Sequence, residues 1–250
     1  MMSPLLSVQG LHKSFGQLVV LFGLQLEVKQ GDIIGLIGPN GSGKTTLLNL
    51  ISGTEAVDRG SICVAGNDIT SWPAWRRPQV GIGRCFQDSR LWANLTVGEH
   101  LLAVADTRGS AQVRGRMNSL ASLVGLDVGI HRRYPDAINL LDRRRLELVM
   151  ASFSASYLLL LDEIGAGLNF DEACTLYDRV NALVLDQKVG AVLMVEHRLG
   201  LVEGYSTAIG MMNEGQLVQT VRGDHSDFQL AIQNMFPNSK KYLQKEIPRW

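Results

Sequence analysis

A glycine-rich stretch near the N-terminus has the residue types and spacing of a loop that binds phosphate. It reads G-P-N-G-S-G-K-T over residues 38–45. Glycines let successive backbone N–H groups turn inward around an anion, because no Cβ stands in the way. In the matching pattern G-x-x-x-x-G-K-[ST], the P-loop, the lysine contacts the β- and γ-phosphates and the hydroxyl holds Mg²⁺. We therefore expect Lys44 to reach the phosphates of a nucleotide and Thr45 to contact the metal.

Two adjacent carboxylates follow a run of four leucines at residues 158–161. They belong to Asp162 and Glu163, at the expected carboxyl end of a buried strand. Ligands of open α/β sheets bind outside that end of the strands. We expect Asp162 to orient Mg²⁺ and its waters. Glu163 has the chemistry of a general base for an attacking water, or of a group that orients this water.

The elements expected around these groups alternate between strand and helix. The apolar run at residues 32–37 predicts a strand buried on both faces, and the helical pattern at 44–52 points its positive end at the phosphates. From about residue 88 to 156 the pattern changes to amphipathic helices. The sequence therefore predicts one α/β core with a helical insertion. Further strands are expected at 7–11, 19–22, 24–28, 61–64, 80–86, 157–161 and 191–195, a hairpin at 207–212 and 216–221, and helices at 97–105, 111–124, 143–153 and 171–185.

Composition excludes several classes of protein. The chain has 250 residues, with 24 Lys+Arg against 24 Asp+Glu and a formal net charge of zero. This balance argues against a nucleic-acid partner, which requires a basic face to neutralise phosphates. No apolar run reaches the roughly 18–20 residues that span a bilayer, so we expect a protein without a membrane-spanning segment. The 3 cysteines are scattered without metal-ligand spacing, and we expect them to be reduced.

The order and spacing of these motifs resemble the nucleotide-binding subunit of ATP-binding cassette (ABC) transporters, over residues 5–222. In that family an aromatic residue at the position of Phe15 stacks on adenine. A glutamine at the position of Gln87 senses Mg²⁺ and contacts the membrane subunit, and a histidine at the position of His197 contacts the γ-phosphate. Residues 165–169 match the loop that crosses the interface between two such subunits.

The resemblance implies a fold and a site. The fold is that of the P-loop ABC ATPases, an α/β fold with a mixed sheet core, an antiparallel β subdomain and a helical subdomain at about residues 88–156. The implied cofactors are ATP and Mg²⁺. The implied catalytic residues are Glu163, His197 and Lys44, and the metal-binding residues are Thr45, Gln87 and Asp162. The implied nucleotide-binding residues are Phe15, Gly38, Pro39, Asn40, Gly41, Ser42, Gly43, Lys44, Thr45, Thr46 and Gln87.

Within the family the wording is closest to one branch. The segments 81–87, 90–97 and 166–169 and the sequence Val-Glu-His at 195–197 resemble the ATPases of branched-chain amino-acid importers. Importers of urea and short amides share much of this wording and stay open as an alternative. The implied partners are transmembrane permease subunits, a second ABC ATPase subunit and, indirectly, a solute-binding protein. The implied location is the cytoplasmic face of the membrane.

One motif departs from the family. The family signature, Leu-Ser-Gly-Gly-Gln or a near variant, lies about 20 residues before the strand-end aspartate, where this chain reads Ile-Asn-Leu-Leu-Asp at 138–142. The signature of one subunit faces the ATP bound by the other, so Leu140 and Leu141 place bulk where the family uses glycine for close approach. Asp142 is a good helix N-cap residue. We expect a complete nucleotide half-site and an impaired signature, which favours a heterodimer with an intact relative over a homodimer. A milder departure is Ile164, where the family commonly has proline.

Three functions remain open at this point. The first is ATP hydrolysis coupled to import, the second an ATP-binding regulatory subunit with little hydrolysis, and the third a cassette ATPase of translation or DNA repair. Relatives of the third kind usually carry two cassettes or long coiled-coil insertions. We expect one ABC ATPase domain over residues 1–236 and a basic tail over 237–250. The tail is interpreted as a solvated end, with contact to anionic lipid as the alternative.

Overall fold

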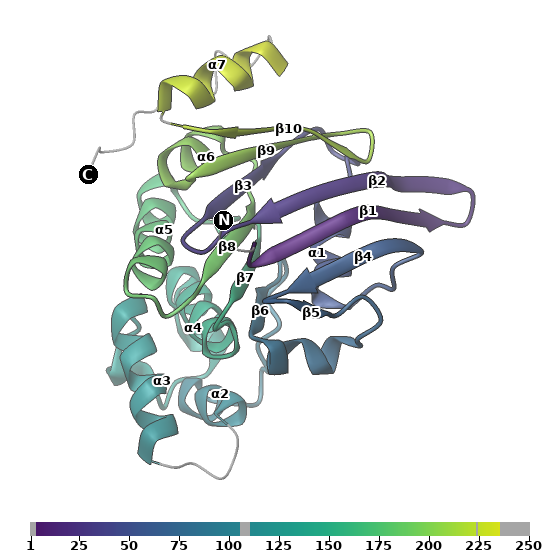
Figure 1. The fold of residues 1–250 in the computed structure, drawn as a ribbon. Coiled ribbons are helices and arrows are strands. Elements are labelled where there is room, and N and C mark those ends of the chain that lie inside the picture. Colours follow the sequence, from purple (N-terminus) through teal and green to yellow (C-terminus); the bar gives the residue numbers. More distant parts are fainter. Residues whose placement is uncertain (1–3, 106–110, 224, 236–250) are drawn as a thin grey trace.

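The computed structural model describes residues 4–105, 111–223 and 225–235, and its larger sheet has six strands (Figure 1). The strand order is β10 (Gln216–Arg222), β9 (Ala208–Asn213), β3 (Ile33–Ile37), β8 (Ala191–Val195), β7 (Leu158–Asp162) and β6 (Ile82–Cys85). All neighbours pair in parallel except β9 and β10, which form an antiparallel hairpin. Because β3, β8, β7 and β6 are parallel, the residues that follow them meet at one edge of the sheet.

The second sheet has four antiparallel strands, in the order β2 (Leu18–Val28), β1 (Leu6–Phe15), β4 (Arg59–Val64) and β5 (Asn67–Asp68). The two strands expected at 19–22 and 24–28 are one continuous strand. Leu21 pairs with Lys13 and Leu24 with Leu11, so β2 carries one extra residue there. Such a bulge bends a strand without ending it, and Gly23 allows it with a φ of +64°.

Helices lie on both faces of the larger sheet. Helix α1 (Lys44–Ser52) packs between the two sheets, in a core with residues of β1, β2, β3 and β7. The opposite face is covered by a second core, to which the other long helices contribute. They are α2 (Val97–Val104), α3 (Ala111–Val124), α4 (Leu140–Ser154), α5 (Phe170–Leu185), α6 (Leu199–Tyr205) and α7 (His225–Met235). The described residues also contain three short 3₁₀ helices, η1 (Ala74–Val80), η2 (Val128–Ile130) and η3 (Pro135–Ala137). The sequence patterns did not predict α6, α7 or η1.

The region between β6 and β7 is helical in the described residues and contains α2, α3, η2, η3 and α4. Helix α4 starts at Leu140 and not at residue 143 as expected. The reason is Asn139, whose side-chain oxygen accepts a hydrogen bond from the backbone N–H of Asp142 at 2.8 Å. This is the geometry of an N-cap, so Asn139 and not Asp142 caps the helix, and Leu140 and Leu141 form its first turn.

The architecture confirms the expected fold class, an α/β fold with a mixed sheet and an additional antiparallel sheet. Within the described ranges, no helix has the length and apolar content needed to cross a membrane. The basic tail expected at 237–250 lies outside the described residues, as do positions 1–3, 106–110, 224 and 236 of the expected domain.

Candidate functional site

The glycine-rich loop joins the end of β3 to the start of α1. Gly43 precedes the helix with a φ of +98°, a left-handed conformation that favours glycine. A Cβ on Gly43 would lie 2.5 Å from a methyl of Leu21, and one on Gly38 would run into the backbone carbonyl of Met212. The loop is thus fitted between β2 and β9 at positions where only glycine is accommodated. Its backbone N–H groups lie at a helix N-terminus, where an anion is favoured.

Lys44 and Ser42 present polar groups to this loop. The Lys44 ammonium donates hydrogen bonds to the carbonyls of Gly38 at 2.8 Å and Pro39 at 3.0 Å. Burial lowers the pKa of Lys44, while the negative charges of Glu163 and Asp162 act in the opposite direction. The Ser42 hydroxyl is buried and has no hydrogen-bond partner within the described part of the chain. A phosphate group would supply acceptors to both side chains, so the loop fits such a ligand.

Asp162 ends β7 and is buried beside the loop. Its Oδ1 lies 3.4 Å from the Thr45 hydroxyl, which donates to it, and its Oδ2 accepts from Arg84 Nη2 at 2.9 Å. Hydroxyl and carboxylate oxygens are ligands that hard divalent cations prefer. Thr45 and Asp162 could therefore hold such a cation together with the oxygens of a bound phosphate.

Glu163 lies at the centre of the second group of candidate residues. Its carboxylate accepts hydrogen bonds from Gln87 Nε2 at 3.0 Å and from His197 Nε2 at 2.7 Å. Gln87 follows β6, and His197 follows β8, so the parallel strands on either side of β7 supply the two partners. Glu163 itself has a φ of +51°, a conformation that costs a non-glycine residue free energy and is found at functional sites.

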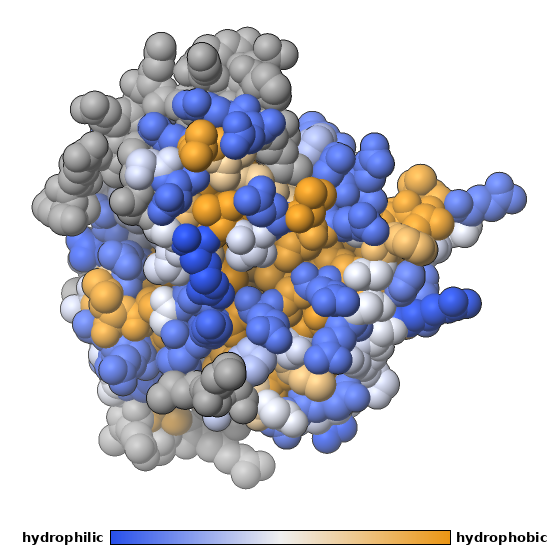
Figure 2. Space-filling view, turned by 45° about the horizontal axis from the view of Figure 1, so that its top comes forward, coloured by the Kyte–Doolittle hydropathy of each residue, from blue (hydrophilic) through white to orange (hydrophobic). Residues whose placement is uncertain are grey.

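The structure thus brings six predicted residues together at one sheet edge, namely Lys44, Thr45, Gln87, Asp162, Glu163 and His197. Pro39, Asn40 and Gly41 lie in the loop, with Thr46 in the first turn of α1. Phe15 lies apart from this group, at the turn from β1 into β2. Its ring is 45% exposed, with the Lys13 ammonium 5.0 Å from the ring centroid. Figure 2 shows apolar side chains on this projecting hairpin, where Leu18 and Val19 are also exposed.

The altered signature segment is fixed by contacts within the chain. Besides accepting from the Asp142 N–H, the Asn139 side chain donates to the Asp142 carboxylate at 3.0 Å. Asp142 also accepts from Arg145 Nη1 at 3.0 Å. The Leu140 methyl Cδ2 lies 2.9 Å from the position that a Cβ would take on Gly167, so Leu140 packs on the loop that follows Glu163. Both ends of the Asn139 amide are therefore engaged.

Two arginines in the site were given no role from the sequence. Arg198 follows His197 and donates to the carbonyls of Gly165 at 2.7 Å and Leu168 at 3.2 Å. Arg84, on β6, forms the ion pair with Asp162. The only sequence signal for Arg84 is a charged residue within an otherwise apolar strand, which does not reveal its partner.

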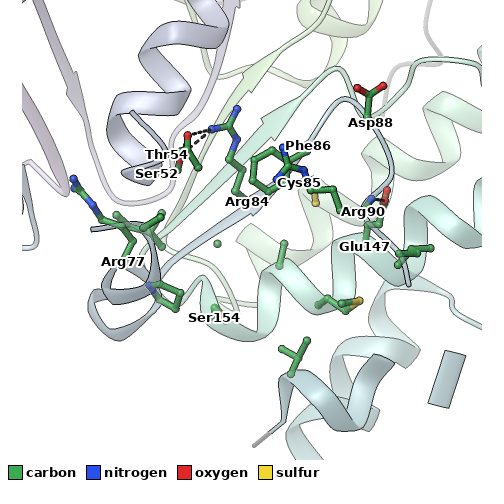
Figure 3. Close-up of a pocket in the computed structure, with 18 of the residues that line it drawn as sticks. Ser52, Thr54, Arg77, Arg84, Cys85, Phe86, Asp88, Arg90, Glu147 and Ser154 are labelled. Carbon is green, nitrogen blue, oxygen red and sulfur yellow. Dashed lines mark hydrogen bonds between the residues drawn. The ribbon is translucent and has the colours of Figure 1, made fainter. Parts of the chain in front are cut away.

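A groove of about 480 Å³ opens next to Gln87 (Figure 3). Residues of η1, β6, α4 and the segment that follows β6 line it. Its walls combine apolar side chains with three arginines, Arg77, Arg84 and Arg90. Arg84 and Arg90 both lie on the Phe86 ring, with guanidinium carbons 4.5 and 3.9 Å from its centroid. The groove is therefore separate from the phosphate loop but shares Arg84 with the Asp162 site.

A P-loop at the end of the central strand of a mostly parallel sheet defines the class of P-loop nucleotide-binding proteins. Within this class, the family model described as "ABC transporter" matches residues 21–166. An uncharacterized ABC transporter ATP-binding protein of Rhizobium meliloti (strain 1021) is 36% identical over 204 residues, covering 79% of this chain and 74% of the relative. LivG of Salmonella typhimurium (strain LT2), a high-affinity branched-chain amino acid transport ATP-binding protein, is 32% identical over 234 residues, or 86% of this chain and 90% of the relative.

The chain therefore belongs to the ABC transporter family, as its ATP-binding ATPase component. Solved structures agree at the level of the fold. The ADP conformation of MJ1267, an ATP-binding cassette of an ABC transporter, matches with a TM-score of 0.84 and 23% identity, covering 98% of this chain and 100% of that chain.

Proposed function

We propose that the chain is the ATP-hydrolysing subunit of a membrane importer for branched-chain or related amino acids. The observation that carries the catalytic part is the Glu163 carboxylate, held between Gln87 and His197 directly after Asp162. The likeness to LivG supports the substrate class. Import of urea or short amides is the alternative substrate class.

Binding starts at the phosphate loop. The loop N–H groups and the start of α1 bind the phosphates, and Lys44 exchanges its carbonyl partners for the β- and γ-phosphate oxygens. Adenine stacks on the exposed Phe15, on the ring face away from the Lys13 ammonium, which lies 5.0 Å from the ring centroid. These contacts use the nucleotide-binding residues expected from the sequence, from Phe15 to Thr46.

Hydrolysis then depends on Glu163. Thr45, Asp162 and Gln87 would hold Mg²⁺, which when bound neutralises charge on the phosphate oxygens. Glu163 orients the attacking water and takes its proton, and positioned bases of this kind typically contribute 10²–10⁴-fold to the rate. His197, hydrogen-bonded to Glu163 at 2.7 Å, is placed to contact the γ-phosphate.

The membrane partner is a permease that docks in the groove beside Gln87. The groove combines apolar side chains with three arginines and includes Trp92, which is 51% exposed. Gln87 also donates a hydrogen bond to Glu163. A displacement of the segment around Gln87 when the permease moves would therefore shift the Glu163 carboxylate. The chain is placed on the cytoplasmic face of the membrane as a peripheral subunit, and a solute-binding protein acts with it only indirectly.

The second ATPase subunit is a different chain with an intact signature. In this chain the Asn139 amide is used within α4, and Leu140 packs on Gly167, so neither is free to approach a partner's ATP. A homodimer would have two impaired composite sites. A heterodimer would have one competent site, formed by Lys44, Glu163 and His197 of this chain with the partner's signature.

The same feature of α4 favours one alternative, an ATP-binding regulatory subunit with little hydrolysis. Steady-state ATPase activity separates the two, measured on the purified chain alone and with the ATPase and membrane subunits encoded beside it. We expect turnover well below about 1 s⁻¹ alone and ordinary turnover in the mixture, abolished by Glu163→Gln. Activity of the chain alone would contradict the heterodimer. Silence in both samples, with ATP still bound, would support the regulatory subunit.

A further inference from the structure

Arg84 is a buried cation on β6 that contacts both the end of β7 and the end of α1. Its side chain is 6% exposed. Nη2 donates to Asp162 Oδ2 at 2.9 Å, and Nη1 donates to the Ser52 hydroxyl at 2.7 Å. Ser52 is the last residue of α1, the helix that begins at the phosphate loop. One guanidinium therefore ties the end of this helix to the end of β7.

The two oxygens of Asp162 have different partners. Oδ2 is held by Arg84 in a short, charge-assisted hydrogen bond, while Oδ1 has the weaker contact with Thr45 at 3.4 Å. Fixing Oδ2 removes the rotation of the carboxylate about its Cβ–Cγ bond. Asp162 Oδ1 is then kept on the side of Thr45, where it and the Thr45 hydroxyl oxygen can face one cation.

The plane of the guanidinium is fixed as well. Its central carbon lies 4.5 Å from the centroid of the Phe86 ring, and Figure 3 shows Arg84 between Phe86 and the Ser52 hydroxyl. Lysine presents a single flexible ammonium and cannot hold two acceptors and a ring in one plane. The geometry thus requires arginine, not only a positive charge.

We propose that Arg84 is a positioning residue that sets the Asp162 carboxylate in its metal-binding orientation. This inference rests on the proposed function, in which Asp162 is a ligand of Mg²⁺. A purely structural ion pair is the competing explanation, because breaking a buried pair destabilises a fold whatever its role. The two explanations differ in one observable, the dependence of nucleotide binding on metal.

Charge-preserving variants test the orientation alone. Neutralising Arg84 would alter the local field and the geometry together, so we choose Arg84→Lys and Ser52→Ala, which leave the net charge unchanged. The probe is mant-ATP, a fluorescent ATP analogue, titrated into the full-length chain in EDTA and at increasing Mg²⁺. Both variants are expected to raise the Mg²⁺ concentration for half-maximal binding about 3- to 10-fold, as for one lost hydrogen bond. Affinity in EDTA is expected to stay within about twofold.

The matched control is Arg90→Lys, because Arg90 lies on the same ring in the same groove and, in the described part of the chain, makes no hydrogen bond or ion pair with Asp162 or Ser52. It should leave the Mg²⁺ midpoint unchanged. Competition between Mn²⁺ and Mg²⁺, followed by the electron paramagnetic resonance of free Mn²⁺, gives the same midpoint without fluorescence. If Arg84→Lys does not fold, Ser52→Ala combined with Thr54→Val decides the question, because the Thr54 hydroxyl also accepts from Arg84 Nη1, at 3.4 Å.

The possible results distinguish failure of the Arg84 role from failure of the proposed function. An unchanged Mg²⁺ midpoint in folded Ser52→Ala and Arg84→Lys would overturn the role of Arg84, as would an equal loss of affinity in EDTA. A shift of the same size in Arg90→Lys would also overturn it. A wild-type chain that binds no mant-ATP at any Mg²⁺ concentration would instead overturn the proposed function, and this inference with it.

Discussion

Arg198 connects the loops that carry the two candidate catalytic side chains. It follows His197, and its guanidinium donates to the carbonyls of Gly165 and Leu168 in the loop after Glu163. Its Nε also donates to the Glu196 carboxylate at 3.3 Å. A Cβ on Gly165 would run into the Arg198 guanidinium. Because the φ of Gly165 is not in the left-handed region, the close approach of the Arg198 guanidinium and not backbone strain is what favours glycine here.

The first prediction concerns this contact. Gly165→Ala should displace the guanidinium, lower the free energy of unfolding by about 1–3 kcal/mol through lost hydrogen bonds, and reduce ATPase activity of the mixed complex roughly 10- to 100-fold by misplacing Glu163. Urea unfolding and steady-state ATPase measure the two effects. Gly115→Ala is the matched control, since its added methyl meets nothing within 4 Å. In an Arg198→Ala background the Gly165→Ala effect should largely disappear, and additive effects would contradict the contact.

The second prediction concerns pH. Burial raises the pKa of Glu203 from 4.5 to about 7, so the folded chain holds a proton that the unfolded chain releases near 4.5. The contribution of Glu203 to the free energy of unfolding should therefore be fully present below about pH 4.5. It should be lost as the pH rises to about 7, by at most about 3 kcal/mol. Urea unfolding of wild type and Glu203→Gln between pH 5 and 8 measures the difference. Equal pH slopes for the two proteins would show that Glu203 is not the cause.

For single side chains, the sequence predicted those that belong to a motif and missed those whose role depends on a distant hydrogen-bond partner. Lys44, Glu163 and His197 belong to local patterns, which fixed spacing reveals. Arg84 and Arg198 are defined by acceptors 78 and 33 residues away along the chain, and no local pattern encodes such pairs. The roles of all five stay predictions until the variants are measured.

Among the elements, the start of α4 carries the proposed heterodimer, in which this segment faces the nucleotide bound by the partner. The segment has Asn139 as its cap, two leucines in the first turn, and Asp142 paired with Arg145. Leucine favours helix more than glycine does, so α4 is well formed at its first turn. The same leucines exclude the close backbone approach that glycines would permit.

The third prediction exchanges this segment. Replacing Asn139, Leu140 and Leu141 by Ser, Gly and Gly restores the family wording while keeping a capping side chain. We expect the free energy of unfolding to fall by roughly 2–4 kcal/mol, because two glycines enter a helix and the packing of Leu140 is lost. ATPase activity of the homodimer should nevertheless rise at least about tenfold. Adding Glu163→Gln should silence the graft, and a folded graft without any gain would contradict an impaired signature.

The observed boundaries of the strands and helices agree with the sequence patterns at some elements and differ from them at others. Buried strands such as β3 and β7 were predicted from their apolar runs, since both are covered on both faces. The sequence predicted two strands on either side of Gly23, because a glycine often indicates a break. In the structure β2 continues through a bulge at Gly23, since it stays paired with β1 on both sides of it. Helix α4 was expected to begin at residue 143, with Asp142 as a good N-cap residue, whereas in the structure the Asn139 side chain makes the capping hydrogen bond and the helix begins at Leu140. Tertiary pairing and caps, not propensity, set these boundaries.

For the whole molecule, the arrangement of four parallel strands explains why one edge gathers the chemistry. Strand β3 leads to the phosphate loop, β7 to the two carboxylates, β8 to His197 and β6 to Gln87. The segment after β6 continues into the groove, so the nucleotide site and the groove adjoin through Gln87 and Arg84. A partner seated in the groove would therefore be close to Glu163, the proposed base, and to Asp162, the proposed metal ligand.

The last prediction tests that surface. Ser154 ends α4 and lines the groove, so Ser154→Arg should fill it and add a fourth guanidinium beside Arg77, Arg84 and Arg90. Copurification with the membrane subunits is expected to fall at least about tenfold, as for the loss of central contacts in an interface. Leu102→Arg is the matched control, because Leu102 is 60% exposed on α2 and lies outside the groove wall. If both substitutions weaken copurification equally, added charge and not groove occupancy is the cause. If neither does, the permease docks elsewhere.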